Sequence, residues 1–150
     1  MNVEQKHSPE LLALSAEFRE ALRHSVFFAR RFDSDGELSV AQLSMLNMVA
    51  SGPVRVGEIA RNLGVKVPSA TEQIIRLEKA GLVLRQPDPE DSRAVRVALT
   101  EAGKQTAASS NERRNHSMAG VLAALTAQDR EALSKALPVI SKINNNIHQD

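Results

Sequence analysis

Apolar residues recur every three or four positions along most of the chain, which is the spacing of amphipathic helices. The first stripe runs from Leu11 to Phe32. It follows Ser8, a residue type that caps helices, and Pro9, whose fixed φ suits a first helical turn. The run 33–37 contains two aspartates and a glycine but no apolar residue, so we expect the helix to break there.

Further helices are predicted on both sides of a central ribbon. A capping-box pattern of Ser39 and Gln42 begins a helix that runs through Val49, and two more helices span 56–63 and 68–80. After the ribbon, Thr100 and Thr126 can each cap a helix, and an apolar stripe extends from Leu133 to Ile147. Pro138 lies inside this last stripe and should kink or locally break the helix.

The ribbon has the pattern of a β-hairpin. Residues 82–84 are a short β-prone run, and apolar and other residues alternate over 95–99, as in a half-buried strand. Residues 86–93 include two prolines and no apolar side chain, so we expect a solvent-exposed loop. The predicted fold class is mainly α with a small β-hairpin wing.

The helix predicted at 68–80 has one narrow apolar stripe, formed by Ala70, Ile74 and Leu77. Its other faces are free for contact, and their side chains can hydrogen-bond base edges or phosphates. The candidate DNA-contacting residues are Pro68, Ser69, Thr71, Glu72, Gln73 and Arg76. Glu72 either accepts from a cytosine amino group or makes no contact, because phosphates repel a carboxylate. The alternative is a surface helix whose polar face meets only water.

The wing carries Asp91 and Arg93 near its tip. A guanidinium suits the narrow minor groove, whose negative potential attracts arginine, and a neighbouring carboxylate can orient that side chain. One interpretation is that Arg93 contacts DNA and Asp91 orients it. The alternative is an exposed turn ion pair worth at most about 1 kcal/mol.

Three sequence fragments together resemble the signature of the multiple antibiotic resistance regulator (MarR) family. They are Leu77-Glu78-Lys79-Ala80-Gly81-Leu82-Val83, Asp91-Ser92-Arg93 and Leu99-Thr100-Glu101-Ala102-Gly103. Their spacing spans a helix end, a wing and the next helix start. Arg55 and Lys66 depart from the family pattern, which often has a hydroxyl or similar capping residue there, so the exact starts of two helices stay open.

The resemblance implies one MarR-type domain over 1–150, with a winged helix-turn-helix at 39–103 and a helical dimerisation region at 8–33 and 104–148. Family members are dimeric transcription regulators, commonly repressors. The implied function is sequence-specific binding of double-stranded DNA, at a pseudo-palindromic operator. The alternative is a winged-helix module used for protein contact.

The terminal helices favour a homodimer independently of the resemblance. Their apolar stripes, which include Phe18, Leu133, Ile140 and Ile147, are wider than one partner helix covers. They either fold onto each other within one chain or interleave with a second copy, and the width favours the second copy.

Many family members release DNA when a small, often aromatic and anionic, ligand binds near the dimerisation helices. On the first helix, Arg23, His24 and Phe27 could offer such an effector a cation, a hydrogen-bond donor and an aromatic wall. A solvated helix face explains the same residues equally well.

Composition narrows the classes of function that remain. The net charge is +1, and between Arg55 and Lys104 nine basic residues face seven acidic ones, so the placement of charge matters more than its total. The chain contains no cysteine, membrane-length apolar run or signal-peptide core, and we expect a cytoplasmic protein. The four histidines lack metal-ligand spacing and no catalytic motif is legible, so we expect no metal, no cofactor and no enzymatic activity.

Overall fold

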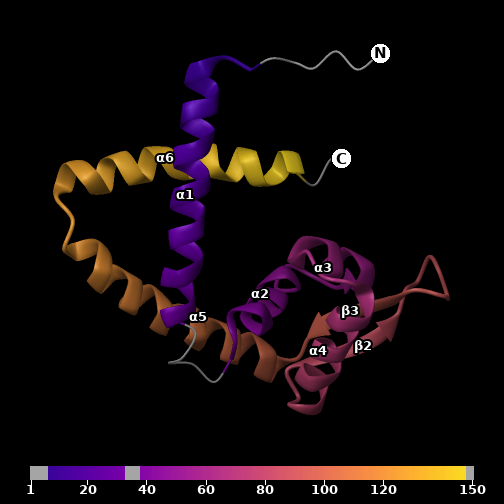
Figure 1. The fold of residues 1–150 in the computed structure, drawn as a ribbon. Helices are drawn as coiled ribbons and strands as arrows, with labels where there is room; N and C mark the ends of the chain where they lie inside the picture. Colours follow the sequence, from indigo (N-terminus) through magenta and orange to yellow (C-terminus); the bar gives the residue numbers. More distant parts are fainter. Residues whose placement is uncertain (1–6, 33–37, 148–150) are drawn as a thin grey trace, which may run out of the picture. The chain divides into compact units, whose positions relative to one another are not determined.

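The computed structural model describes residues 7–32 and 38–147, and it places α1 (Pro9–Phe32) in one compact unit and every later element in another (Figure 1). The predicted break at 33–37 and the side chain of Ile147 lie outside the described residues. As predicted, Ser8 begins α1, where its Oγ accepts the amide N–H of Leu11 at 3.2 Å.

The second unit contains a helix-turn-helix, a wing and two long helices. In order, its elements are α2 (Val40–Met48), β1 (Val54–Arg55), α3 (Val56–Leu63), α4 (Val67–Lys79), β2 (Val83–Pro87), β3 (Val95–Leu99), α5 (Glu101–Ala123) and α6 (Ala127–Ile147). The predicted helices and hairpin are confirmed; the helix ends differ by a residue or two, and β2 extends three residues beyond the predicted run 82–84. Among the described residues, no helix is both long and apolar enough for a membrane span.

The three strands form an antiparallel sheet in the order β1-β3-β2 (Figure 1). Val54 pairs with Val97, and Val83 pairs with Leu99. The core of the unit lies between the helix-turn-helix and this sheet. Its largest fully buried side chains are Leu46, Ile59, Ile74, Leu77 and Val97.

The residues that join the elements explain why the chain turns where it does. Gly64 ends α3 with φ 64° and Gly81 follows α4 with φ 75°, a left-handed conformation that glycine adopts without strain. Thr100 caps α5 as predicted, because its Oγ1 accepts the N–H of Gly103 at 3.0 Å while donating to the carbonyl of Gly81 at 2.6 Å. Thr126 likewise accepts the N–H of Asp129 at 3.1 Å at the start of α6.

One expectation from the sequence was wrong, and at Pro138 one of the two predicted outcomes, the break rather than the kink, is removed. The predicted exposed loop at 86–93 is shorter, because β2 continues to Pro87; β2 is an edge strand, where the missing N–H of proline removes no ladder bond. Asp88, expected in solvent, is buried. At Pro138 the predicted local break is absent, since α6 is helical on both sides of it. Pro138 and Ser134 are exposed, so water can bind the carbonyl that loses its helical donor.

Candidate nucleic-acid interface

The polar face of α4 is presented to solvent. Ala70, Ile74 and Leu77 are buried, which confirms the predicted apolar stripe. Of the candidate contact residues, Pro68, Ser69, Glu72 and Arg76 are exposed, and Thr71 and Gln73 are half-buried. The Thr71 hydroxyl donates to the carbonyl of Val67 at 2.9 Å, within its own helix, and its lone pairs can still accept.

Glu72 and Arg76 form an ion pair one helical turn apart. Arg76 Nη2 donates to Glu72 Oε1 at 2.6 Å, and both side chains are more than half exposed. The carboxylate therefore holds the Arg76 guanidinium against the surface of α4. The surface of α4 therefore presents an ion pair at this position rather than an isolated cation.

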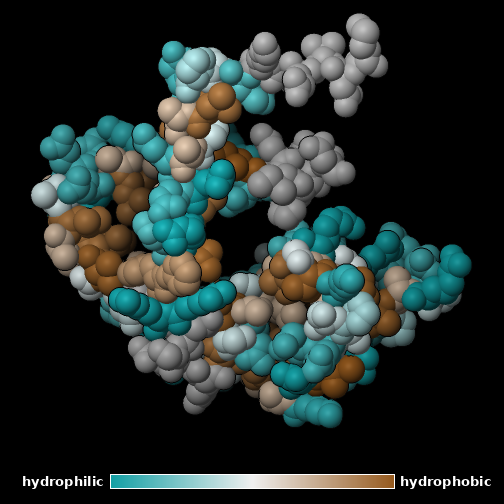
Figure 2. All heavy atoms as spheres, in the orientation of Figure 1, coloured by the Kyte–Doolittle hydropathy of each residue, from teal (hydrophilic) through white to brown (hydrophobic). Residues whose placement is uncertain are grey.

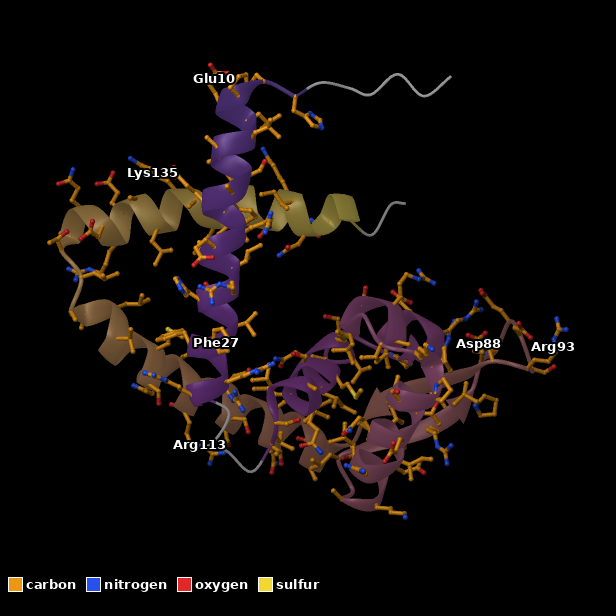
Figure 3. All side chains as sticks on the ribbon, in the orientation of Figure 1. Glu10, Phe27, Asp88, Arg93, Arg113 and Lys135 are labelled. Carbon is orange, nitrogen blue, oxygen red and sulfur yellow. The ribbon has the colours of Figure 1, made fainter. Side chains whose placement is uncertain are left out.

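The wing projects Arg93 at its tip. The Arg93 side chain is 92% exposed, and Figure 3 shows it at the outer end of the hairpin. Asp91 Oδ1 accepts the backbone N–H of Arg93 at 3.0 Å and lies 3.5 Å from its Nε. The structure thus brings the two predicted wing residues together, with Asp91 beside the cation that it was predicted to orient.

Asp88 lies at the base of this tip and is the main site residue that sequence reasoning missed. Its side chain has no exposed surface, and its Oδ2 accepts from Arg55 Nε at 2.7 Å and from Arg96 Nε at 2.6 Å. Its Oδ1 accepts the backbone N–H groups of Glu90 and Asp91 at 2.8 and 3.1 Å. The hydrogen bond from Arg55 is the largest of the effects that hold the pKa of Asp88 far below its usual range.

The pairing of β1 with β3 explains why a carboxylate is needed there. Arg55 lies directly opposite Arg96 in the register, and like charges at such positions repel. Asp88 lies between them and neutralises the repulsion. In the sequence, this cluster is indicated only by the two arginines. They show the need for a carboxylate only once the register that places them opposite each other is known.

A second ion pair joins the wing to α4. Glu78, near the end of α4, accepts from Arg85 Nη2 at 3.1 Å, from Arg85 Nε and from the Arg85 backbone N–H. These bonds lower the pKa of Glu78 and raise that of Arg85. The hairpin is therefore fixed to the start of α3 by Asp88 and to the end of α4 by Arg85.

A groove of about 570 Å³ lies between α3, α4 and the wing. Four arginines line it, and the lining includes one carboxylate, Glu58: Arg55 of β1, Arg61 of α3, Arg85 of β2 and Arg93 of the wing tip. Its apolar lining includes Val67 and Ile74 of α4 and Val95 of β3. Arg55, Arg85 and Arg93 each have a carboxylate partner, so the groove between the exposed face of α4 and the wing tip is lined largely by ion-paired guanidinium groups, whose remaining N–H donors can still bind phosphate.

Comparisons with known proteins agree with this architecture. The model of the MarR family matches residues 38–95, which contain the helix-turn-helix and the wing turn. The HTH-type transcriptional regulator Mb0904 of Mycobacterium bovis is 34% identical over 100 residues, which are 66% of this chain and 70% of that protein. The chain belongs to the MarR family. It is therefore a transcription regulator with a winged helix-turn-helix, not a member of an enzyme family.

Solved structures of transcription regulators share the fold over nearly the whole chain. The transcriptional regulator BldR of Sulfolobus solfataricus is 26% identical with a TM-score of 0.68, covering 89% of this chain and 96% of that one. AbsC, a MarR family regulator of Streptomyces coelicolor, is 22% identical with a TM-score of 0.69, covering 88% and 94%. At 22% identity, the likeness to AbsC shows the fold alone.

The candidate effector residues lie on an exposed face of α1 in this MarR-family chain. Arg23 Nε donates to Glu20 Oε2 at 3.0 Å, and Arg23 Nη2 lies 2.9 Å from His24 Nε2, so these two side chains are close. Phe27 is 54% exposed, and the guanidinium carbon of Arg30 lies 5.9 Å from its ring centre. Glu20 and Arg30 were not among the predicted residues; Glu20 contacts both Arg23 and His24, and Arg30 lies over Phe27.

Proposed function

We propose that the protein is a cytoplasmic regulator that binds a pseudo-palindromic operator as a homodimer and represses transcription. In each subunit α4 enters the major groove, where Ser69, Thr71 and Arg76 meet base edges, and Arg93 enters the flanking minor groove. The observation that carries the proposal is the 92% exposed guanidinium at the tip of a hairpin fixed to both helices of the helix-turn-helix.

Two arginine variants separate reading of sequence from attachment to the backbone. Operator DNA is first obtained by sequencing the genomic fragments that the protein retains. Arg93→Ala should weaken binding to operator and random DNA alike and reduce the salt slope by about one unit. Arg76→Ala should weaken operator binding more than random binding, because a bidentate base contact is worth about 1–3 kcal/mol of discrimination.

If both variants lost affinity equally for operator and random DNA, with the same change in salt slope, α4 would not read the base sequence. A wild-type protein without a steep salt dependence would favour the protein-contact module, since only phosphate contacts release counterions.

Exposed apolar side chains support the homodimer. On α1, Leu11, Leu12, Leu14, Leu22, Val26 and Phe27 are between 47% and 62% exposed, and on α6 Leu137 and Val139 are 54% and 55% exposed. Figure 2 shows hydrophobic surface along the α5 and α6 part of the molecule. Surface of this extent is typical of a protein interface. The proposed dimerisation region is therefore 8–33 and 104–148, and sedimentation of the wild-type protein measures its stoichiometry.

An effector on α1 completes the proposal. A small aromatic anion would compete with Glu20 for Arg23 and His24 and stack on Phe27. Titrating benzoate-type acids into the complex of protein and operator tests this site. Failure of every such acid to release DNA at about millimolar concentration, where weak ligands bind, would remove it.

A further inference from the structure

The wing tip is a closed turn built around one buried carboxylate. Its base is closed by the backbone N–H of Asp88, which donates to the carbonyl of Ala94 at 3.0 Å, and the N–H of Ala94 donates to the carbonyl of Asp91 at 2.9 Å. Inside the turn, Asp88 Oδ1 accepts the N–H of Asp91, and Asp91 Oδ1 accepts the N–H of Arg93. A continuous series of hydrogen bonds therefore leads from Asp88 to the cation at the tip.

We propose that Asp88 is the positioning residue of the DNA-binding wing: it orients Arg93 through Asp91 and fixes the hairpin to the start of α3 through Arg55. This inference rests on the proposed function, in which Arg93 enters the minor groove. Asp88 itself has no exposed side-chain surface and cannot touch DNA. Figure 3 shows it on the helix side of the tip, with Arg93 beyond it.

Each half of the carboxylate serves one part of this role. Oδ1 orders the tip, because two of the turn's backbone N–H groups donate to it. Oδ2 orients the hairpin, because Arg55 is both the last residue of β1 and the N-cap of α3. Arg55 makes no side-chain bond to the first turn of α3, and its guanidinium is directed to Asp88 instead. The position of Arg93 relative to α4 is thus fixed before DNA binds. Less conformational entropy is then lost on binding.

Asp88→Asn tests the proposal with little change of shape. The amide oxygen can still accept from the turn, but the amide nitrogen cannot accept from the two arginines. Affinity for operator DNA should fall about fivefold or more, in the range of one lost arginine contact. In an Arg93→Ala background the same substitution should change affinity less than about twofold, because the residue through which Asp88 acts is gone.

Two controls sharpen this double-mutant cycle. Glu131→Gln alters net charge by the same amount on α6, where Glu131 pairs with Lys135, and it should leave affinity within about twofold. If Asp88→Asn does not fold, Arg96→Gln replaces it, since Arg96 donates to the same oxygen and does not line the groove. Arg96→Gln should lower the affinity for operator DNA by a smaller factor than Asp88→Asn. This loss should also vanish in the Arg93→Ala background.

Equal losses from Asp88→Asn in the wild-type and Arg93→Ala backgrounds would overturn the proposal, because Asp88 would then act independently of Arg93. Amide hydrogen exchange provides a test without DNA. Asp88→Ala removes both oxygens, so it should speed exchange at Asp91 and Arg93 while leaving α4 unchanged, and unchanged exchange at the tip would refute the ordering role. Failure of the proposed function looks different: wild-type protein would not bind operator DNA, or Arg93→Ala would have no effect.

Discussion

Gly103 should be a position where the smallest possible enlargement damages the fold. A Cβ built on Gly103 would lie 1.9 Å from the carbonyl oxygen of Leu82, 2.9 Å from its carbonyl carbon and 3.1 Å from Leu99 Cδ2. The Leu82 carbonyl already accepts the N–H of Thr100 at 3.1 Å. Gly103→Ala must therefore push α5 away from the start of β2, or break the bond that connects the two.

The magnitude follows from three contributions. A carbon and an oxygen normally approach no closer than about 3.3 Å, so the backbone must move by more than about 1 Å, and overpacking of this kind costs about 3 kcal/mol. Loss of the bond from Thr100 to Leu82 adds about 1 kcal/mol. The higher helix propensity of alanine offsets about 1 kcal/mol of this cost. We expect Gly103→Ala to lower the free energy of unfolding by about 3 kcal/mol.

Gly120 lies in the same helix and supplies the control, since nothing lies within 4 Å of its Cβ position. Gly120→Ala should raise the free energy of unfolding by about 0.5–1 kcal/mol. Urea unfolding is followed by far-UV circular dichroism at one fixed protein concentration, because the chain has no Trp or Tyr for fluorescence. If Gly103→Ala were as stable as the wild type, close helix–strand approach would not explain this glycine.

Three other predictions concern the interface, the buried carboxylate and the recognition helix. Ile140→Asp should give a monomer or an unfolded chain in sedimentation, because it puts an unpaired charge at a half-buried position of α6; a stable dimer would contradict the dimer assignment. The depressed pKa of Asp88 means that its stabilisation is complete above its ordinary value of 3.8 and is lost as pH falls below it. The Tm difference between wild type and Asp88→Asn should thus stay constant from about pH 5 to 8 and shrink below about pH 4; a gap that shrinks near neutral pH would implicate another group. Glu72→Gln should strengthen operator binding about threefold in an anisotropy titration, because it frees Arg76 and removes a charge that phosphates repel; weaker binding would mean that Glu72 reads a base.

Features that depend on neighbouring residues were predictable from the sequence. The caps at Ser8, Thr100 and Thr126 and the buried stripe of α4 use patterns only three or four residues long. The same holds for Asp91 and Arg93, which are two residues apart. Local chemistry is sufficient to identify such features, because the partners are already adjacent in the chain.

Asp88 could not be identified in this way. Composition placed it in an exposed loop, since an aspartate is buried only when charged partners compensate for the lost water. Those partners, Arg55 and Arg96, are 33 and 8 residues away and meet only through the register of β1 with β3. The paired amides of Asn47 and Asn111, which join α2 to α5 across 64 residues, escaped prediction for the same reason.

The order of strands in the sheet also dictates when the DNA-binding unit can be completed during synthesis. β1 precedes the helix-turn-helix, yet its hydrogen-bonding neighbour is β3, whose Val97 pairs with Val54. A nascent chain that ends before β3 leaves β1 and β2 without their shared neighbour and Asp88 without Arg96. The facing edges of β1 and β2 therefore stay unpaired on the ribosome until Leu99 has emerged.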